Sequence, residues 1–214
     1  MITAWLTFTA SLRLTFWRIG TLLIGNVLWL LLTLLIVTAP PASAGLHYLA
    51  RRLTDPEEED RTTWRHFFEG LKIYWLLSWQ VAGLNWGIGM VLIVNLFFYV
   101  QSPQLPIQLI AVVIFYIFLV WLEMQLYLFP LLIEQQDKSI RLIFKNALLL
   151  TIKNPGFTFT FGLLLLSMLL VSSALGGPIF LILFSFIAIG RTYATRRMLG
   201  IGLDERPVPR FGSK

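Results

Sequence analysis

The sequence predicts an all-α membrane protein with five transmembrane helices and additional interfacial amphipathic helices. Hydrophobic residues occupy 57% of the 214 positions and charged residues only 13%, about half the charged share of a soluble domain. No Asp, Glu, Lys or Arg occurs from 73 to 122 or from 154 to 190. Because one helix crosses the ~30 Å hydrocarbon core with about 20 residues, each stretch has room for two crossings. A water-soluble globular fold is excluded.

The first elements are a short amphipathic helix and one span. Residues 1–18 are predicted to lie in the membrane interface, because Arg13 and Arg18 interrupt a stretch too short to cross. The first span is predicted over 19–38, an apolar run that ends just before a pair of prolines. This run is the start of a single membrane domain that we expect to cover 19–199.

Residues 40–45, Pro-Pro-Ala-Ser-Ala-Gly, are predicted to form a hinge between the first span and an interfacial helix over 44–53. Proline lacks the amide hydrogen and clashes one turn back, so it does not continue a preceding helix. An alternative is a signal-peptidase site at 42–44. Cleavage there would leave five basic residues outside, and the apolar run is longer than the ~7–15 residues of a signal peptide. The span is the preferred interpretation.

The remaining apolar sequence divides at two turns. An uncharged loop with two prolines, 101–106, separates the second span from the third, and Gly176-Gly177-Pro178 separates the fourth from the fifth. The predicted spans after the first are 76–100, 107–124, 155–175 and 178–195, with cytoplasmic amphipathic segments at 44–75 and 138–153 and a basic, disordered tail at 200–214. Whether the two amphipathic segments mark an internal duplication stays open.

The basic residues predict the orientation. Lys and Arg number two in 1–18, five in 39–75, four in 134–154 and six in 191–214, and none occurs in the loops 101–106 and 176–177. Cytoplasmic loops carry the excess of Lys and Arg. The pattern therefore predicts an outside N-terminus and a cytoplasmic C-terminus, with Arg13 and Arg18 as the two exceptions.

The acidic run 55–60, Asp-Pro-Glu-Glu-Glu-Asp, is interpreted as a helix start. Asp is a common N-cap, proline suits the first helical position, and negative charge is favourable in the first turn.

Few residues offer chemistry. The chain has no cysteine, and its two histidines lack a second ligand at metal spacing. No metalloprotease helix, nucleophile elbow or phosphate-binding loop is present. The sequence predicts no catalytic site, no cofactor and no metal site, and the net charge of +6 reflects membrane topology rather than nucleic-acid binding.

Three polar residues are the binding candidates: Glu123, Arg191 and Asn26. Glu123 lies ~24 Å along the third span, near its cytoplasmic end. We expect it to form a structural ion pair with Arg191 at the end of the fifth span. A role in transport or coupling, and the absence of a specific partner, remain alternatives. Gly83 and Gly87 are spaced for close helix packing, with a partner helix that the sequence does not identify.

The chain resembles the YesL-like family of bacterial integral membrane proteins. The resemblance rests on Asn26-Val27-Leu28-Trp29, Thr38, Pro41-Ala42 and Leu46-His47-Tyr48, followed by Phe67-Phe68, Phe129-Pro130 and Phe144-Lys145-Asn146-Ala147. It covers roughly residues 15–200. Family members often have a proline late in the first span, where this chain has Leu35. The resemblance implies a multi-pass protein of the bacterial plasma (inner) membrane with an accessory role in carbohydrate uptake.

Two functions are consistent with these features of the sequence. The first is an accessory subunit without a catalytic site, which binds a sugar transporter or a sensor kinase subunit within the lipid bilayer. The second is a small transporter or channel in its own right, which would need a polar pathway through the spans. The sequence does not give the oligomeric state.

Overall fold

The computed structural model describes residues 2–175 and 180–201, which form helices and connecting turns without a strand. The predicted all-α fold is confirmed for this part of the chain. The α-helices are α1 (Ile2–Trp17), α2 (Ile19–Thr33), α3 (Ala39–Leu53), α4 (His66–Ile73), α5 (Trp75–Val100), α6 (Leu105–Met124), α7 (Leu128–Glu134), α8 (Ile140–Lys153), α9 (Pro155–Leu175) and α10 (Phe180–Leu199); the short 3₁₀ helices are η1 (Ile36–Thr38) and η2 (Glu59–Arg61).

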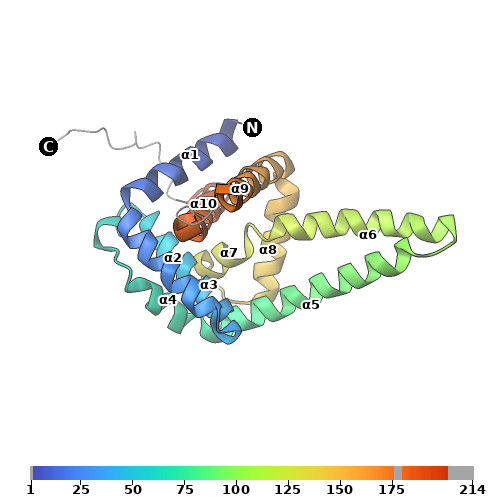
Figure 1. Cartoon of the computed structure of the whole chain (residues 1–214), viewed down its shortest axis with the longest axis horizontal. Helices are drawn as coiled ribbons and strands as arrows, with labels where there is room; N and C mark the ends of the chain where they lie inside the picture. Colours follow the sequence, from blue (N-terminus) through green and yellow to red (C-terminus); the bar gives the residue numbers. More distant parts are fainter. Residues whose placement is uncertain (1, 176–179, 202–214) are drawn as a thin grey trace.

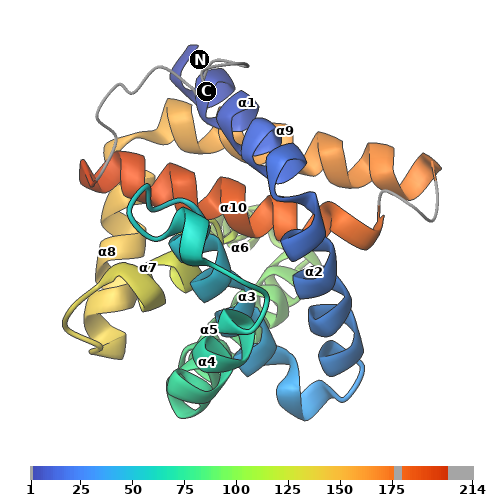
Figure 2. The same ribbon diagram turned by 90° about the vertical axis from the view of Figure 1, so that its left-hand side faces the viewer.

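The helices divide into a body and a long hairpin. α5 and α6 form the hairpin, which projects away from the other helices (Figure 1). α9 and α10 belong to the body and run across the direction of the hairpin (Figure 2). The predicted segments 76–100, 107–124, 138–153 and 155–175 correspond to α5, α6, α8 and α9, with boundaries that differ by at most two residues.

Three described helices are long and apolar enough to cross a membrane, namely α5, α6 and α9. A fourth crossing is counted if α1 and α2, which meet at a bend of 95°, act as one broken span. The five predicted spans are thus not confirmed. The fifth, 178–195, corresponds to α10, which carries three arginines and is not among the candidate spans of the described residues. The predicted Gly-Gly-Pro turn and most of the basic tail lie outside the described residues.

The first predicted span, 19–38, is not one helix. α2 ends at Thr33, and the chain turns through Leu34 and Leu35 into η1. Ile36 has a φ of +29°, a backbone conformation that β-branched residues rarely adopt. The chain reverses its direction here without a proline, since residue 35 is Leu.

The predicted hinge at 40–45 is also displaced. Pro40 and Pro41 lie within the first turn of α3, where the missing amide hydrogens have no helical partner to lose. The same helix continues to Leu53, so the reversal takes place over residues 34–38 instead. A Cβ on Gly45 would lie 2.6 Å from the backbone oxygen of Phe67. The glycine is needed in α3 because α4 packs directly against its backbone.

α3 is the central helix of the body and is buried along most of its length. α2 packs against it at Gly25, where a Cβ would lie 2.8 Å from Leu49. Farther along, the indole Nε1 of Trp29 donates a 3.1 Å hydrogen bond to Ser43 Oγ. The apolar side chains around this contact are Leu22, Leu46, Leu49, Leu53, Phe67 and Ile189, from α2, α3, α4 and α10.

A separate contact joins the two helices of the α5–α6 hairpin. A Cβ on Gly89 would lie 2.7 Å from the ring of Trp121, so the indole occupies the space that a side chain would fill. Trp121 Nε1 donates a 3.0 Å hydrogen bond to Asn85 Oδ1, and Asn85 Nδ2 donates to Gln125 Oε1 over 2.9 Å. The Asn85–Trp121–Gln125 contact is neutral throughout.

Candidate functional site

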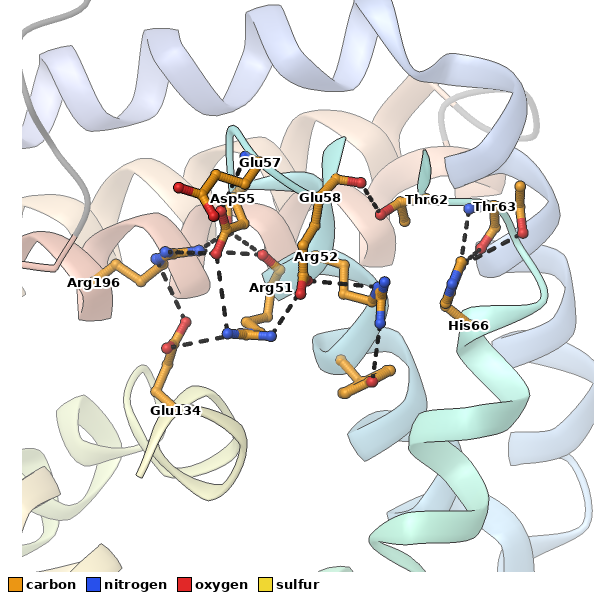
Figure 3. A network of polar contacts seen from close by, with 12 residues as sticks. Arg51, Arg52, Asp55, Glu57, Glu58, Thr62, Thr63, His66, Glu134 and Arg196 are labelled. Carbon is orange, nitrogen blue, oxygen red and sulfur yellow. Dashed lines mark hydrogen bonds and ion pairs between the residues drawn. The ribbon is translucent and has the colours of Figure 1, made fainter. Parts of the chain in front are cut away.

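The body contains a charge cluster, which we define as Arg51, Arg52, Asp55, Glu58, Glu134 and Arg196 (Figure 3). Its residues come from the end of α3, the segment after it, the end of α7 and the last turns of α10. The cluster thus brings together three segments that the positive-inside pattern places in the cytoplasm.

Arg196 is the centre of the cluster, and its side chain is only 6% exposed. Nη2 lies 3.3 Å from Asp55 Oδ2, and Nε lies 3.6 Å from Glu134 Oε1. Nη1 donates to the backbone oxygen of Arg51 and to Thr54 Oγ1, each over 3.3 Å. A buried arginine with two carboxylates and two neutral acceptors has its charge compensated on several sides.

Arg51 and Arg52 extend the cluster toward solvent. Arg51 Nη1 donates to Glu58 Oε2 over 3.3 Å, and its other nitrogens lie 4.0 Å from Asp55 and from Glu134. Arg52 Nε lies 3.6 Å from the same Glu58 oxygen. Glu58 is therefore paired with two arginines, which are adjacent in the sequence at the end of α3.

Glu134 is the deepest carboxylate of the cluster, with a side chain that is 6% exposed. Burial raises its pKa, although Arg196 and Arg51 act in the opposite direction. Its Oε1 accepts no hydrogen bond, so its compensation is Coulombic at ion-pair distances. Burial also lowers the pKa of Lys138, which donates to the carbonyls of Leu132 and Ile133 at the end of α7.

The acidic run 55–60 is not a helix start. Only η2 forms there, and α4 begins at His66. The run instead provides counter-ions: Asp55 and Glu58 bind arginines of the cluster, while Glu59 Oε1 lies 3.0 Å from Arg18 Nε. The carboxylates of this segment therefore pair with arginines that are distant in the sequence and do not cap a helix.

Arg18 lies between α1 and α2, and it also contacts Asp60. The sequence places Arg18 outside and residues 39–75 in the cytoplasm, on opposite sides of a membrane. In the structure the two are in direct contact.

Glu123 and Arg191 do not form the expected ion pair. The Arg191 guanidinium donates to the backbone oxygen of Leu126 over 3.2 Å and to that of Gln125. These carbonyls follow the end of α6, where a cation is favourable. Glu123 points to α9, where a Cβ on Gly162 would lie 3.0 Å from Glu123 Oε2. That oxygen is buried without a hydrogen-bond partner.

Asn26 is fully buried and joins α2 to α10. Its Oδ1 accepts a 2.9 Å hydrogen bond from the backbone N–H of Ser185, while Ser185 Oγ donates to the backbone oxygen of Leu22 over 2.8 Å. These reciprocal contacts are those of a helix-packing residue. The structure therefore does not bring the three binding candidates together.

The histidines lie apart. His47 is buried in α3, its ring packs on Phe129 at 5.5 Å between centroids, and Nδ1 lies 2.8 Å from the backbone oxygen of Ser43. His66 Nδ1 accepts a 3.0 Å hydrogen bond from the backbone N–H of Thr63, just before α4. Among the described residues no group of three His, Cys, Asp or Glu side chains is placed to hold a metal ion.

A small cavity lies between α3, α5 and α7. Its volume is ≈ 160 Å³, and its lining includes Ser43, Asn85, Trp86 and Phe129. This is well below the ~300–1,000 Å³ of ordinary ligand pockets.

Comparison with known proteins gives one family. Residues 22–96 match the DUF624 family. Its members are described as proteins of unknown function, and the family includes the YesL-like proteins. The matched segment covers most of α2, all of α3 and α4, and most of α5. It therefore includes the contact of α2 with α3 and four residues of the charge cluster, Arg51, Arg52, Asp55 and Glu58. No curated protein and no solved structure matches the chain.

Sequence reasoning missed Glu134 and Arg196 as partners. A usable signal exists in the sequence: Glu134 is a single carboxylate that directly follows an apolar run from 126 to 133. A charge at the end of such a run calls for a counter-ion from another segment.

Proposed function

We propose that this protein is a non-catalytic accessory subunit that binds another integral membrane protein. Following its resemblance to YesL-like proteins and the DUF624 match, we place it in the bacterial plasma membrane, beside a sugar transporter or a sensor kinase. The proposal is about partner binding, and the sugar connection comes from the resemblance alone.

The observation that carries the proposal is an open small-residue face on α5. A Cβ on Gly83 or on Gly87 would meet no atom within 4 Å. Gly89 on the same helix, by contrast, is covered by Trp121 of α6. Glycines spaced by four residues allow another helix to approach closely in lipid. The hairpin thus uses one glycine for its own packing and leaves a pair available to a partner helix.

The two asparagines of α5 support the same function, because their amides are engaged within the chain. Asn85 binds Trp121 and Gln125, and Asn95 donates to the backbone oxygen of Val91 one turn earlier. A pathway for a hydrated sugar needs polar groups that face a continuous space. Among the described residues of the two helices, Asn85 uses its amide to join α5 to the end of α6, and Asn95 uses its amide within α5.

The test is copurification from native membranes with a matched pair of variants. Gly87→Leu fills the open face of α5, and Gly156→Leu fills an equally open position on α9. We expect Gly87→Leu to lose a membrane partner that the wild type and Gly156→Leu both retain. Equal recovery of all membrane proteins by the three chains would contradict the proposal.

Glu123 favours the second candidate function, a small transporter. Its Oε2 is buried beside Gly162 without a hydrogen-bond partner, and an ionisable group within a span often serves transport. Solute flux into liposomes that contain only the purified protein, lost in Glu123→Gln, would support this function over partner binding.

A further inference from the structure

We infer that α2, η1 and α3 form a re-entrant hairpin that enters the bilayer from the cytoplasmic side and returns to the same side. Its turn, Leu34, Leu35, Ile36 and Val37, would contact lipid hydrocarbon, and residues 1–18 would lie in the cytoplasm. The inference does not depend on the proposed partner.

The first step is that α2 and α3 run antiparallel in contact. Gly25 lies against Leu49, near the far end of α3, whereas Trp29 binds Ser43, near its beginning. The residues of α2 that come later in the chain therefore face residues of α3 that come earlier. The start of α2 and the end of α3 lie at one end of the hairpin.

The second step is that this end is closed by ion pairs. Arg18, directly before α2, contacts Glu59 and Asp60, soon after α3. Direct contact between charged side chains is possible only on one side of a hydrocarbon core. The same segment binds Arg196 of α10 through Asp55, which places the end of α1 and the end of α10 on that side.

The third step is length. The 15 residues of α2 rise ~22 Å at about 1.5 Å per residue. The hydrocarbon core is ~30 Å thick. The length of α2 is the upper limit of the depth of the hairpin, so the hairpin turns before it reaches the opposite surface.

The fourth step identifies the occupant of the apolar turn. The four residues of the turn are 62% to 79% exposed. No Asp, Glu, Lys or Arg occurs between 19 and 50. The carbonyl of Val37 accepts a 3.0 Å hydrogen bond from Trp79 Nε1, which is four residues after the start of α5, so the turn lies beside the cytoplasmic end of this candidate span. An exposed, uncharged turn at the other end of the hairpin from the ion pairs, and beside the first turns of a candidate span, fits a shallow position in the cytoplasmic leaflet.

This arrangement removes the exceptions to the positive-inside pattern. With residues 1–18 in the cytoplasm, all 17 Lys and Arg residues fall in segments on that side. Both ends on one side require an even number of crossings, whereas the five predicted spans are an odd number. Because α5, α6 and α9 are three candidate crossings and Arg196 lies beside Asp55, the inference also requires α10 to return the chain to that side.

The absence of native cysteine allows single-cysteine labelling with a membrane-impermeant maleimide. Ala10→Cys and Arg18→Cys test α1 and its end, Glu57→Cys and Asp137→Cys provide cytoplasmic references, and Gln104→Cys provides the outer reference. In intact spheroplasts we expect Gln104→Cys to react, and the other four to react only after permeabilisation. Reaction of Ala10→Cys or Arg18→Cys together with Gln104→Cys would overturn the inference.

Depth is measured separately on Leu35→Cys labelled with an environment-sensitive fluorophore in liposomes. We expect quenching by nitroxide-labelled lipid and protection from aqueous iodide, with the opposite pattern for labelled Glu57→Cys. Iodide quenching of the label at 35 equal to that at 57 would show that the turn lies in water and would overturn the lipid contact.

Discussion

The body and the α5–α6 hairpin are held together by different chemistry. In the body, arginines and carboxylates from four segments meet in the charge cluster, and two of these side chains are almost fully buried. In the hairpin, the corresponding contact consists of a tryptophan and two amides, and no charged residue occurs from 75 to 122.

The difference indicates how each region is solvated. Neutral amides satisfy one another at little cost in lipid, whereas an uncompensated charge there costs several kcal/mol. The side chains of the charge cluster lie at or near the ends of helices. The hairpin can therefore face lipid on most sides, while the body depends on complete pairing inside it.

Removing the centre of the charge cluster should have the largest effect. Arg196→Gln leaves Glu134 and Asp55 without their nearest cation from α10, and such a loss costs about 3–5 kcal/mol of stability. Thermal unfolding in detergent, followed by tryptophan fluorescence, measures it. Arg141→Gln, at an exposed position of α8, is the control and should unfold like the wild type. Equal stability of the two variants would mean that the ion pairs of Arg196 contribute nothing to the stability of the protein.

A steric change in the α5–α6 hairpin should cause an intermediate loss of stability. Gly89→Ala forces its new methyl group against the Trp121 ring, and overpacking of this kind costs about 1–3 kcal/mol. The matched change Gly87→Ala on the open face should be neutral or slightly stabilising, because alanine favours the helix. If both variants lose stability equally, helix α5 rather than its contact with α6 is responsible.

The loss of a hydrogen bond in the α5–α6 hairpin should cause a smaller loss of stability. Asn85→Leu removes the hydrogen bonds to Trp121 and Gln125, which are worth about 1 kcal/mol between helices in lipid. Asn95→Leu removes only a bond to its own helix and should be tolerated. The same thermal unfolding assay in detergent measures both variants. If Asn85→Leu loses more stability than Arg196→Gln, the hairpin depends on its polar contacts more than the body depends on the charge cluster.

The smallest effect concerns pH. Because burial raises the pKa of Glu134, its contribution to stability is complete below the unfolded pKa of the carboxyl and is lost as pH rises through the folded value. Glu134→Gln lacks this titration. The stability of the variant relative to the wild type should therefore increase with pH across that interval and then level off. A difference that is constant with pH would show that Glu134 titrates alike in both states.

Local patterns predicted the helices well and their contacts poorly. The uncharged stretches and the proline turns located α5, α6 and α9, because membrane thickness imposes length and composition on each helix separately. The reversal at residues 34–38 was not predictable in the same way. Nothing in Leu34 to Val37 marks a turn, and the fold-back depends on Gly25 and Trp29 meeting α3.

The candidate site shows the same limit. Glu123 and Arg191 were matched by depth alone, under the assumption that their helices are neighbours there. Arg191 instead binds the carbonyls after α6, and the carboxylate lies against α9. Depth follows from the position of a residue along its helix, but partners depend on the lateral arrangement of helices, which a single sequence does not encode locally.

The contact of Arg196 with Asp55 joins positions 141 residues apart in the chain. During synthesis, Arg51, Asp55 and Glu134 emerge from the ribosome well before the arginine that completes their arrangement. Domains form in the order of synthesis, and long-range contacts close last. Formation of the charge cluster is therefore completed only when α10 has been synthesised. A chain that stops before α10 would leave Asp55 and Glu134 without Arg196, and we expect such a chain to be degraded faster than the full chain.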